Sequence, residues 1–255
     1  MSLRSAVRSL PFASSLVHVA RRAAAPLPRQ VRFWDGVDRP ATEGVAQLFR
    51  LWRRGAETAA ESTAVFAAYD GGDVVDIGAF HGWYAALLSP KARPGDTFVL
   101  VEPDASAIPT LLRIVGALAQ TFPDLHYCVV TKAAGDGSCV RPVYPYGTDG
   151  HPRFEAVEGD DRDRSVTLDG LVAGLGVRPA LLKVDVEGAE VYVLKGALGM
   201  LEAGAPRVML EVHPRWQPEG VEADDLLTLM RERGYVAEDL DVSEDAIRQL
   251  WRRAS

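Results

Sequence analysis

The sequence predicts an α/β domain built on a mostly parallel β-sheet with helices on both faces. Short apolar runs typical of strands alternate with segments of helical periodicity, and glycine or proline breaks fall between them. In addition, 47% of the 255 residues are apolar, enough to bury one sizeable core. We therefore expect a single domain over residues 35–255, with its core at about residues 70–240.

The first half of this domain shows the alternation along the chain. Val45, Leu48 and Trp52 share one face of the first helical segment. Gly71 and Gly72 end the second segment, because glycine breaks regular periodicity. The predicted elements are helices at 42–54 and 56–69, a strand at 74–77, a helix at 82–88, a strand at 97–101, a helix at 106–121 and a strand at 126–130.

The second half begins with an irregular stretch, 135–164, which is rich in Gly, Pro and Asp. We expect it to form a short hairpin or a mobile cover. Near the C-terminus, Glu244 and Asp245 precede Arg252 and match the dipole of a helix that begins near Ser243. The other predicted elements are a helix at 166–173, a strand at 181–186, a helix at 191–202, a strand at 207–212, a helix at 223–233 and an edge strand at 235–240.

The N-terminal segment differs from the rest in charge, because residues 1–32 hold six arginines and no acidic residue. A secretory signal fits poorly, since Pro11 and His18 interrupt the apolar part. We treat residues 1–34 as a basic extension with three open alternatives: a disordered tail, a membrane-surface segment or an organelle transit peptide. We expect a cytoplasmic protein, with peripheral membrane contact through residues 1–32 as the alternative.

Charge and cysteine content exclude several classes of protein. The net charge of −7 argues against a general nucleic-acid partner, which usually presents a basic face. Cys128 and Cys139 provide neither a disulfide framework nor the spacing of a zinc site. No apolar run is long enough to span a bilayer. The sequence carries no signal for oligomeric state.

A charged strand end gives the first functional signal. In residues 181–188, LLKVDVEG, three charged side chains alternate through an apolar run: Lys183, Asp185 and Glu187. Alternate residues of a strand share a face, so Lys183 and Asp185 point the same way. Buried charges are costly unless they are paired or used, so the pattern indicates a strand that opens into a functional cleft. A structural Lys–Asp pair is the alternative.

A glycine turn gives the second signal. Residues 74–82, VVDIGAFHG, contain Asp76, Gly78 and Gly82 in the pattern D-x-G-x-x-x-G. Glycine lets a ligand approach the backbone, and Phe80 replaces the middle glycine of a pyrophosphate-binding turn. Twenty residues after Gly82, Glu102 ends the next predicted strand, where it can accept hydrogen bonds from a ribose. The glycine turn and Glu102 together predict binding of a nucleoside without phosphates.

Six segments in order resemble the FkbM-type methyltransferases: DIGAFHG, VEPD, TKAAGDG, SVTLDGL, LLKVDVEGAEVYVLKGA and MLEVHP. The resemblance implies a class I methyltransferase Rossmann-like fold, with a seven-stranded sheet whose last strand is antiparallel. It also implies an S-adenosylmethionine-dependent O-methyltransferase that acts on a hydroxyl of a small molecule, such as a sugar, a glycan or a polyketide-like acceptor. The family commonly has Asn where Phe80 stands, so contacts near the methionine end differ here.

S-adenosylmethionine fits the glycine turn because it carries no phosphate. Gly78 and Gly82 would lie under its amino-acid end, and Glu102 would hold the ribose. Asp136 would accept from the adenine amino group, although an Asp in a glycine-flanked turn commonly bonds local backbone. The predicted cofactor-binding residues are Asp76, Gly78, Phe80, Gly82, Glu102, Asp136 and Asp185.

The predicted catalytic residues lie at the ends of two strands. A hydroxyl is a weak nucleophile, so a base or a metal would help as its proton departs. The candidates are His213, Asp185, Glu187 and Glu211, with His213 favoured because an ordinary histidine titrates near neutrality. A metal site of Asp185, Glu187 and His213 is the alternative, but their spacing matches no metal motif, so we predict a base without metal. The alternative function is a non-catalytic nucleoside-binding regulatory or scaffolding protein.

Overall fold

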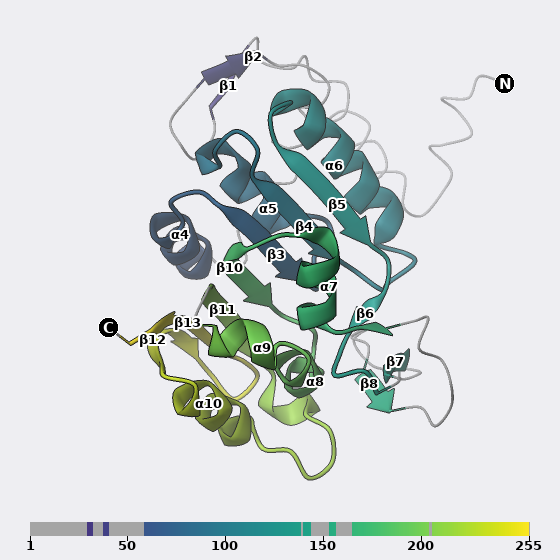
Figure 1. The fold of residues 1–255 in the computed structure, drawn as a ribbon, viewed down its shortest axis with the longest axis vertical. Coiled ribbons are helices and arrows are strands. Elements are labelled where there is room, and N and C mark those ends of the chain that lie inside the picture. Colours follow the sequence, from purple (N-terminus) through teal and green to yellow (C-terminus); the bar gives the residue numbers. More distant parts are fainter. Residues whose placement is uncertain are drawn as a thin grey trace, which may run out of the picture.

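A seven-stranded sheet runs through the computed structural model, which describes residues 30–32, 38–40, 59–138, 140–143, 153–156, 165–203 and 206–254 (Figure 1). The strands lie in the order β12-β13-β11-β10-β3-β4-β5. Their bounds are β3 Asp73–Ile77, β4 Thr97–Val101, β5 His126–Val130, β10 Pro179–Val184, β11 Arg207–Val212, β12 Tyr235–Val242 and β13 Ile247–Arg253. Strands β11, β10, β3, β4 and β5 pair in parallel, whereas β13 is antiparallel to both neighbours. The predicted sheet, with its antiparallel last strand, is confirmed.

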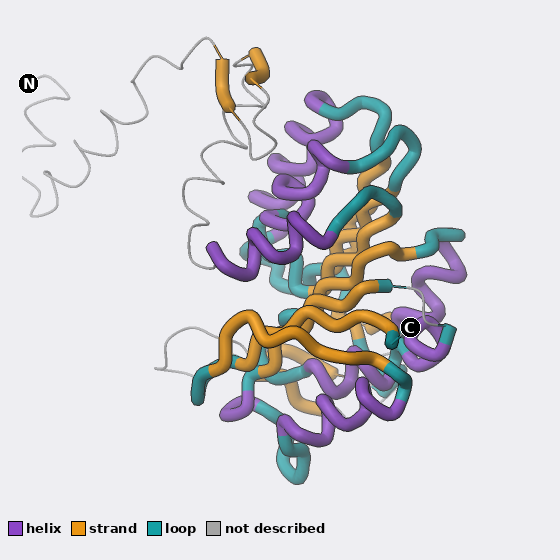
Figure 2. The backbone as a smooth tube through the Cα atoms, turned by 90° about the vertical axis from the view of Figure 1, so that its left-hand side faces the viewer, coloured by secondary structure: helices purple, strands orange, loops and turns teal. Residues whose placement is uncertain are grey.

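Helices cover both faces of this sheet (Figure 2). Buried apolar side chains form two clusters, one on each face. The first includes residues of α5 (Trp83–Leu88) and α6 (Ile108–Thr121), together with α4 (Ala59–Ala68). The second includes residues of α7 (Leu168–Leu175), α8 (Glu190–Lys195), α9 (Leu198–Glu202) and α10 (Ala223–Glu232). The α/β prediction is therefore confirmed.

Short elements complete the described chain. Within the predicted irregular stretch, β7 (Val140–Val143) pairs antiparallel with β8 (Arg153–Ala156), as the hairpin alternative expected. The remaining elements are β1 Gln30–Arg32, β2 Asp38–Pro40, β6 Ala133–Ala134, β9 Ser165–Val166 and the 3₁₀ turns Ser89–Lys91 and Pro214–Trp216. The predicted helix at 42–54 and most of the basic extension lie outside the described residues. In the described part, no helix has the length and apolar character needed to cross a membrane.

One predicted helix is wrong, and another is divided into two. The chain after Ser243 makes a tight turn, in which the Ser243 amide donates to the Ala246 carbonyl at 2.9 Å, and returns as β13 instead of forming a helix. Here Arg248 stands opposite Glu211 of β11, so long-range pairing decides the conformation. The predicted helix at 191–202 is divided into α8 and α9 at Gly196, where a β-carbon would lie only 1.9 Å from the Gly135 carbonyl oxygen.

Candidate functional site

The predicted site residues meet at the carboxyl edge of the parallel strands. Backbone hydrogen bonds join the segments that leave this edge. The Gly78 amide donates to the Val101 carbonyl at 3.0 Å, and the Asp185 amide donates to the Ile77 carbonyl at 3.1 Å. These bonds fix the loops after β3 and β10 against their neighbours. A ligand of an open parallel sheet binds at this edge.

Gly78 cannot be replaced by a residue with a side chain without local rearrangement. Its φ is +76°, and a β-carbon would lie 1.8 Å from the Asp185 carbonyl oxygen. The Lys183 ammonium donates to the Gly78 carbonyl at 3.0 Å. The positive φ agrees with the prediction for this turn, but the close approach is that of the Asp185 carbonyl, so the glycine lets the loops after β3 and β10 touch.

Two residues at this edge adopt a backbone conformation that L-residues rarely take. Phe80 (φ 44°) and Glu187 (φ 55°) are the only non-glycine residues with positive φ in the described part of the chain. Phe80 is 55% exposed, and its ring stacks on His81 at a centroid distance of 3.7 Å. Backbone strain of this kind is found preferentially at functional sites, because the surrounding structure must maintain it.

Glu102 connects the second strand end to the glycine turn. Its carboxylate accepts from the Phe80 amide at 2.7 Å and from the Asp104 amide at 2.8 Å. Burial raises the pKa of Glu102, although the two amide hydrogen bonds oppose the rise. Each carboxylate oxygen has two lone pairs, so both can accept a further donor. The placement of Glu102 fits the predicted ribose contact, which stays a prediction.

Lys183 is paired with two carboxylates: that of Asp185, as the alternative of a Lys–Asp pair expected, and that of Asp76, which was not predicted. Its ammonium lies 3.2 Å from Asp185 Oδ2 and 3.7 Å from Asp76 Oδ1. Burial lowers the pKa of Lys183, but the charges of Asp185 and Asp76 outweigh it and raise the pKa above its ordinary value. Burial raises the pKa of Asp76 to about 6, and neither oxygen of Asp76 has a hydrogen-bond partner. Asp185 Oδ1 is also buried without such a partner.

His213 is held between carboxylates on both sides of its ring. Nδ1 lies 2.9 Å from Glu190 Oε1, whereas Nε2 lies 3.2 Å from Glu187 Oε2 and 3.4 Å from Glu211 Oε1. Burial lowers the pKa of His213, but the hydrogen bonds to Glu190 and Glu211 raise it to about 10. The ring is therefore protonated at neutral pH and has no free lone pair. This removes the premise on which His213 was favoured as the base.

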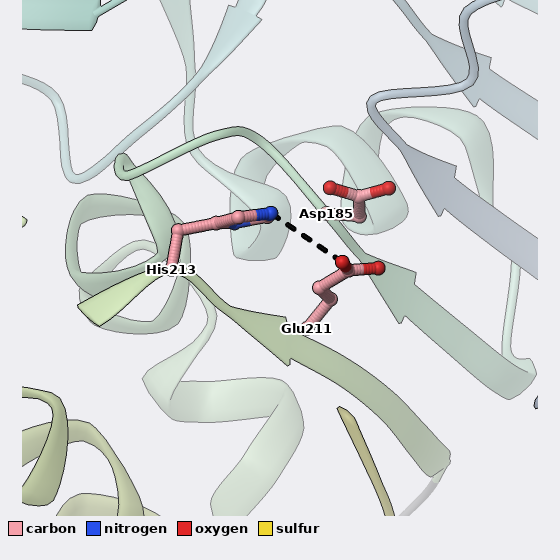
Figure 3. Close-up of side chains that lie close together, drawn as sticks. All are labelled: Asp185, Glu211 and His213. Atoms are coloured by element: carbon pink, nitrogen blue, oxygen red, sulfur yellow. Dashed lines mark ion pairs between the residues drawn. The ribbon is translucent and has the colours of Figure 1, made fainter. Parts of the chain in front are cut away.

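Three side chains lie close together here: Asp185, Glu211 and His213, with an ion pair between His213 and Glu211 (Figure 3). The ligand atoms of Asp185, Glu211 and His213 lie within 4.8 Å of one another, a spacing at which they could hold a divalent ion once the His213 ring has lost a proton. The metal alternative considered from the sequence had Glu187 in place of Glu211. Glu211 also pairs with Arg248, and the His213 hydrogen bond and the Arg248 charge lower its pKa although burial opposes them.

Asp136 forms hydrogen bonds within its own turn, which was the alternative considered from the sequence. Its carboxylate accepts from the Ser138 amide at 2.9 Å and from the Ser138 hydroxyl. Such bonds are typical of an Asp that forms a turn. A bond to the adenine amino group stays a prediction.

Three charged residues near the site were not predicted. Glu190 is 0% exposed, and its place in the KVDVEGAE segment was the signal that could have identified it. Arg248 lies 3.6 Å from the buried Glu61 and pairs with Glu211. No local pattern indicated Arg248 or Glu61, because their contacts join α4 and β13 to β11, and these elements lie far apart in the sequence.

The raised pKa values of His213 and Glu61 predict that the stability of the fold decreases with rising pH. The folded-state pKa of His213, about 10, lies above its ordinary 6.5, so its stabilisation is complete below pH 6.5 and is lost toward pH 10. Burial likewise raises the pKa of Glu61 to about 7, so its ionisation costs stability in the same direction. Urea denaturation should give an unfolding free energy lower by about 3 kcal/mol at pH 9 than at pH 6.5. His213→Gln should reduce this difference, and a stability that rises with pH would contradict the assignment.

Comparison with known proteins identifies the family. Residues 76–237, more than half of the chain, match the family described as the methyltransferase FkbM domain. The hexuronic acid methyltransferase AglP of Haloferax volcanii is 26% identical over 179 residues, which cover 70% of this chain and 69% of that protein.

A solved structure supports the fold. The crystal structure of methyltransferase FkbM from Methylobacillus flagellatus superposes with a TM-score of 0.50 at 16% sequence identity. The match covers 82% of this chain but spans only 59% of that one. The fold is shared, and the predicted family is confirmed. The chain therefore belongs to the FkbM family of methyltransferases.

Proposed function

We propose that the protein transfers the methyl group of S-adenosylmethionine to a hydroxyl of a sugar-containing small molecule. The observation that carries the cofactor assignment is the chemistry at the ends of β3 and β4. Asp76, 2% exposed, lies beside the glycine turn, and apart from the Lys183 ammonium at 3.7 Å its two oxygens have no donor. Glu102 ends the adjacent strand. The ammonium of the cofactor would supply donors to Asp76, and its ribose hydroxyls would donate to Glu102.

Asp185 is the side chain best placed to accept the hydroxyl proton. Lys183 holds Oδ2 at 3.2 Å, while Oδ1 has no hydrogen-bond partner. When bound, S-adenosylmethionine would supply an electrophilic methyl group, whose transfer from sulfur to the acceptor oxygen would release the hydroxyl proton. Asp185 would take the hydroxyl proton and return it to solvent, since its side chain as a whole is 28% exposed although Oδ1 itself is buried. Alignment of the three reacting atoms supplies much of the rate.

The acceptor class follows from the relative in Haloferax volcanii, whose name states that it methylates a hexuronic acid. A uronic acid offers both hydroxyl and carboxylate oxygens. A carboxylate is already deprotonated and needs no base, whereas a hydroxyl does. The unpartnered oxygen of Asp185 therefore favours a hydroxyl acceptor.

Transfer of a labelled methyl group to a panel of hexuronic-acid oligosaccharides tests this function. We expect labelled product that survives mild alkali, because a methyl ether is stable and a methyl ester is not. Label released by alkali would assign the carboxylate instead. Cofactor binding without transfer to any sugar would favour the non-catalytic alternative.

The same assay tests the assignment of a base without metal. We expect turnover to be unchanged when a chelator is added. Activity that is lost in chelator and restored by magnesium or manganese would show that the Asp185, Glu211 and His213 cluster holds an ion.

Replacement of Glu102 by alanine tests the ribose contact. The variant should bind S-adenosylmethionine more weakly by roughly 1.5–3 kcal/mol, about 10–150-fold, because hydrogen bonds to a charged acceptor are lost. Calorimetry measures the affinity, and thermal unfolding checks that the fold persists. Unchanged affinity would show that Glu102 only supports the Phe80 and Asp104 amides.

A further inference from the structure

We propose that Glu190 is a positioning residue for methyl transfer, which fixes the His213 ring so that Nε2–H faces the carboxylates of Glu187 and Glu211. The inference rests on the proposed function. Glu190 is 0% exposed and begins α8, directly behind the strand-end loop that carries Asp185. It therefore cannot touch the acceptor and must act through its neighbours.

The Glu190 carboxylate accepts from three different segments. The Gly188 amide donates to Oε1 at 2.9 Å, and Gln217 Nε2 donates to Oε2 at 2.6 Å. His213 Nδ1 lies 2.9 Å from Oε1. One buried carboxylate thus joins the loop after β10, the end of β11 and the turn that follows it.

The His213 ring is also restrained on its face. Trp216 stacks on it with a centroid distance of 5.0 Å and an interplanar angle of 9°. Stacking fixes the ring plane, and the bond from Nδ1 to Glu190 fixes the rotation within that plane. Nε2 is then directed to Glu187 Oε2 at 3.2 Å and to Glu211 Oε1 at 3.4 Å.

The same carboxylate supports the strained part of the loop. Glu187 has a φ of 55°, and the next amide, that of Gly188, donates to Glu190. Backbone strain persists only where surrounding contacts maintain it. Loss of the Glu190 charge should therefore release both the His213 ring and the Glu187 backbone. The carboxylates at the acceptor side would lose their alignment, while Asp76 and Glu102 at the cofactor side would keep theirs.

Glu190→Gln tests the proposal because it keeps the shape and removes the charge. We expect kcat to fall about 10–100-fold, the usual range for a residue that orients another, while the affinity for S-adenosylmethionine changes less than twofold. Asp169→Asn is the matched control: Asp169 accepts from the Gly199 and Met200 amides at 2.8 and 2.9 Å, as Glu190 does from Gly188. It should lose stability without losing kcat. Unchanged kcat in Glu190→Gln, or an equal fall in the control, would overturn the proposal.

A spectroscopic measurement on the wild-type protein keeps the proposal testable if the variant does not fold. With ¹⁵N-labelled histidine, the Nδ1 proton of His213 should appear strongly downfield, as expected for a hydrogen bond to a buried carboxylate. His213→Gln assigns the signal, and Glu190→Gln should shift it upfield. Absence of the signal from wild type overturns the proposal. Because this readout needs no turnover, it separates failure of the positioning role from failure of the proposed function.

Discussion

Replacement of Asp185 by asparagine is expected to lower turnover by about 10²–10⁴-fold, the usual contribution of a general base. The asparagine keeps the size of the side chain but cannot take a proton from the acceptor hydroxyl. It also removes the charge that lies 3.2 Å from Lys183. Steady-state kinetics with saturating cofactor measure the effect.

Asp70→Asn is the control for this change. It removes an Asp–Lys pair far from the cluster, in which Lys91 lies 3.9 Å from a carboxylate that is 78% exposed. Exposed pairs contribute little, so turnover and stability should stay close to wild type. Turnover of Asp185→Asn within threefold of wild type would remove Asp185 from the catalytic residues.

Replacement of Gly78 by alanine is expected to have the largest effect on the fold and on cofactor binding together. The new β-carbon would lie 1.8 Å from the Asp185 carbonyl oxygen, at a φ of +76° that L-residues rarely adopt. Strain of this kind costs about 1–3 kcal/mol before the clash is counted. The loops after β3 and β10 must separate, so we expect a loss of at least about 3 kcal/mol in unfolding free energy and no measurable cofactor binding.

Gly116→Ala is the matched control, because Gly116 is a helical glycine of α6 with no atom within 4 Å of its added β-carbon. Alanine favours helix over glycine, so this variant should gain about 0.5–1 kcal/mol. Equal effects of the two substitutions, measured by urea denaturation, would contradict the close approach at Gly78.

Local pattern predicted most of the fold. Strands β4, β5 and β11 have the bounds that apolar runs and breaks indicated. In β4 and β11 the reason is burial, because buried strands of a parallel sheet carry nearly continuous apolar residues. The prediction of a C-terminal helix failed for a physical reason. Its acids and arginines fit a helix dipole, but residues 247–253 pair with β11 and β12 and bury Leu250 and Trp251.

The sequence indicated several of the residues that meet at this edge of the sheet, but neither Glu190, Arg248 and Glu61 nor the electrostatics of the cluster. The alternation of Lys183 and Asp185 placed both side chains on one face and left an ion pair between them as an alternative, and the structure has this pair. The protonation state of His213 was not predictable, because it depends on the distances of three carboxylates from the two ring nitrogens. Those distances depend on the packing of α8 against the end of β11, which no local sequence pattern encodes.

Titration calorimetry with S-adenosylmethionine, its demethylated product and NAD tests the central claim most directly. The glycine turn has Phe80 where a pyrophosphate-binding turn has glycine, and Asp76 and Glu102 suit an ammonium and a ribose. We therefore predict binding of the first two ligands and no binding of NAD at the same concentration. Tighter binding of NAD than of S-adenosylmethionine would contradict the account.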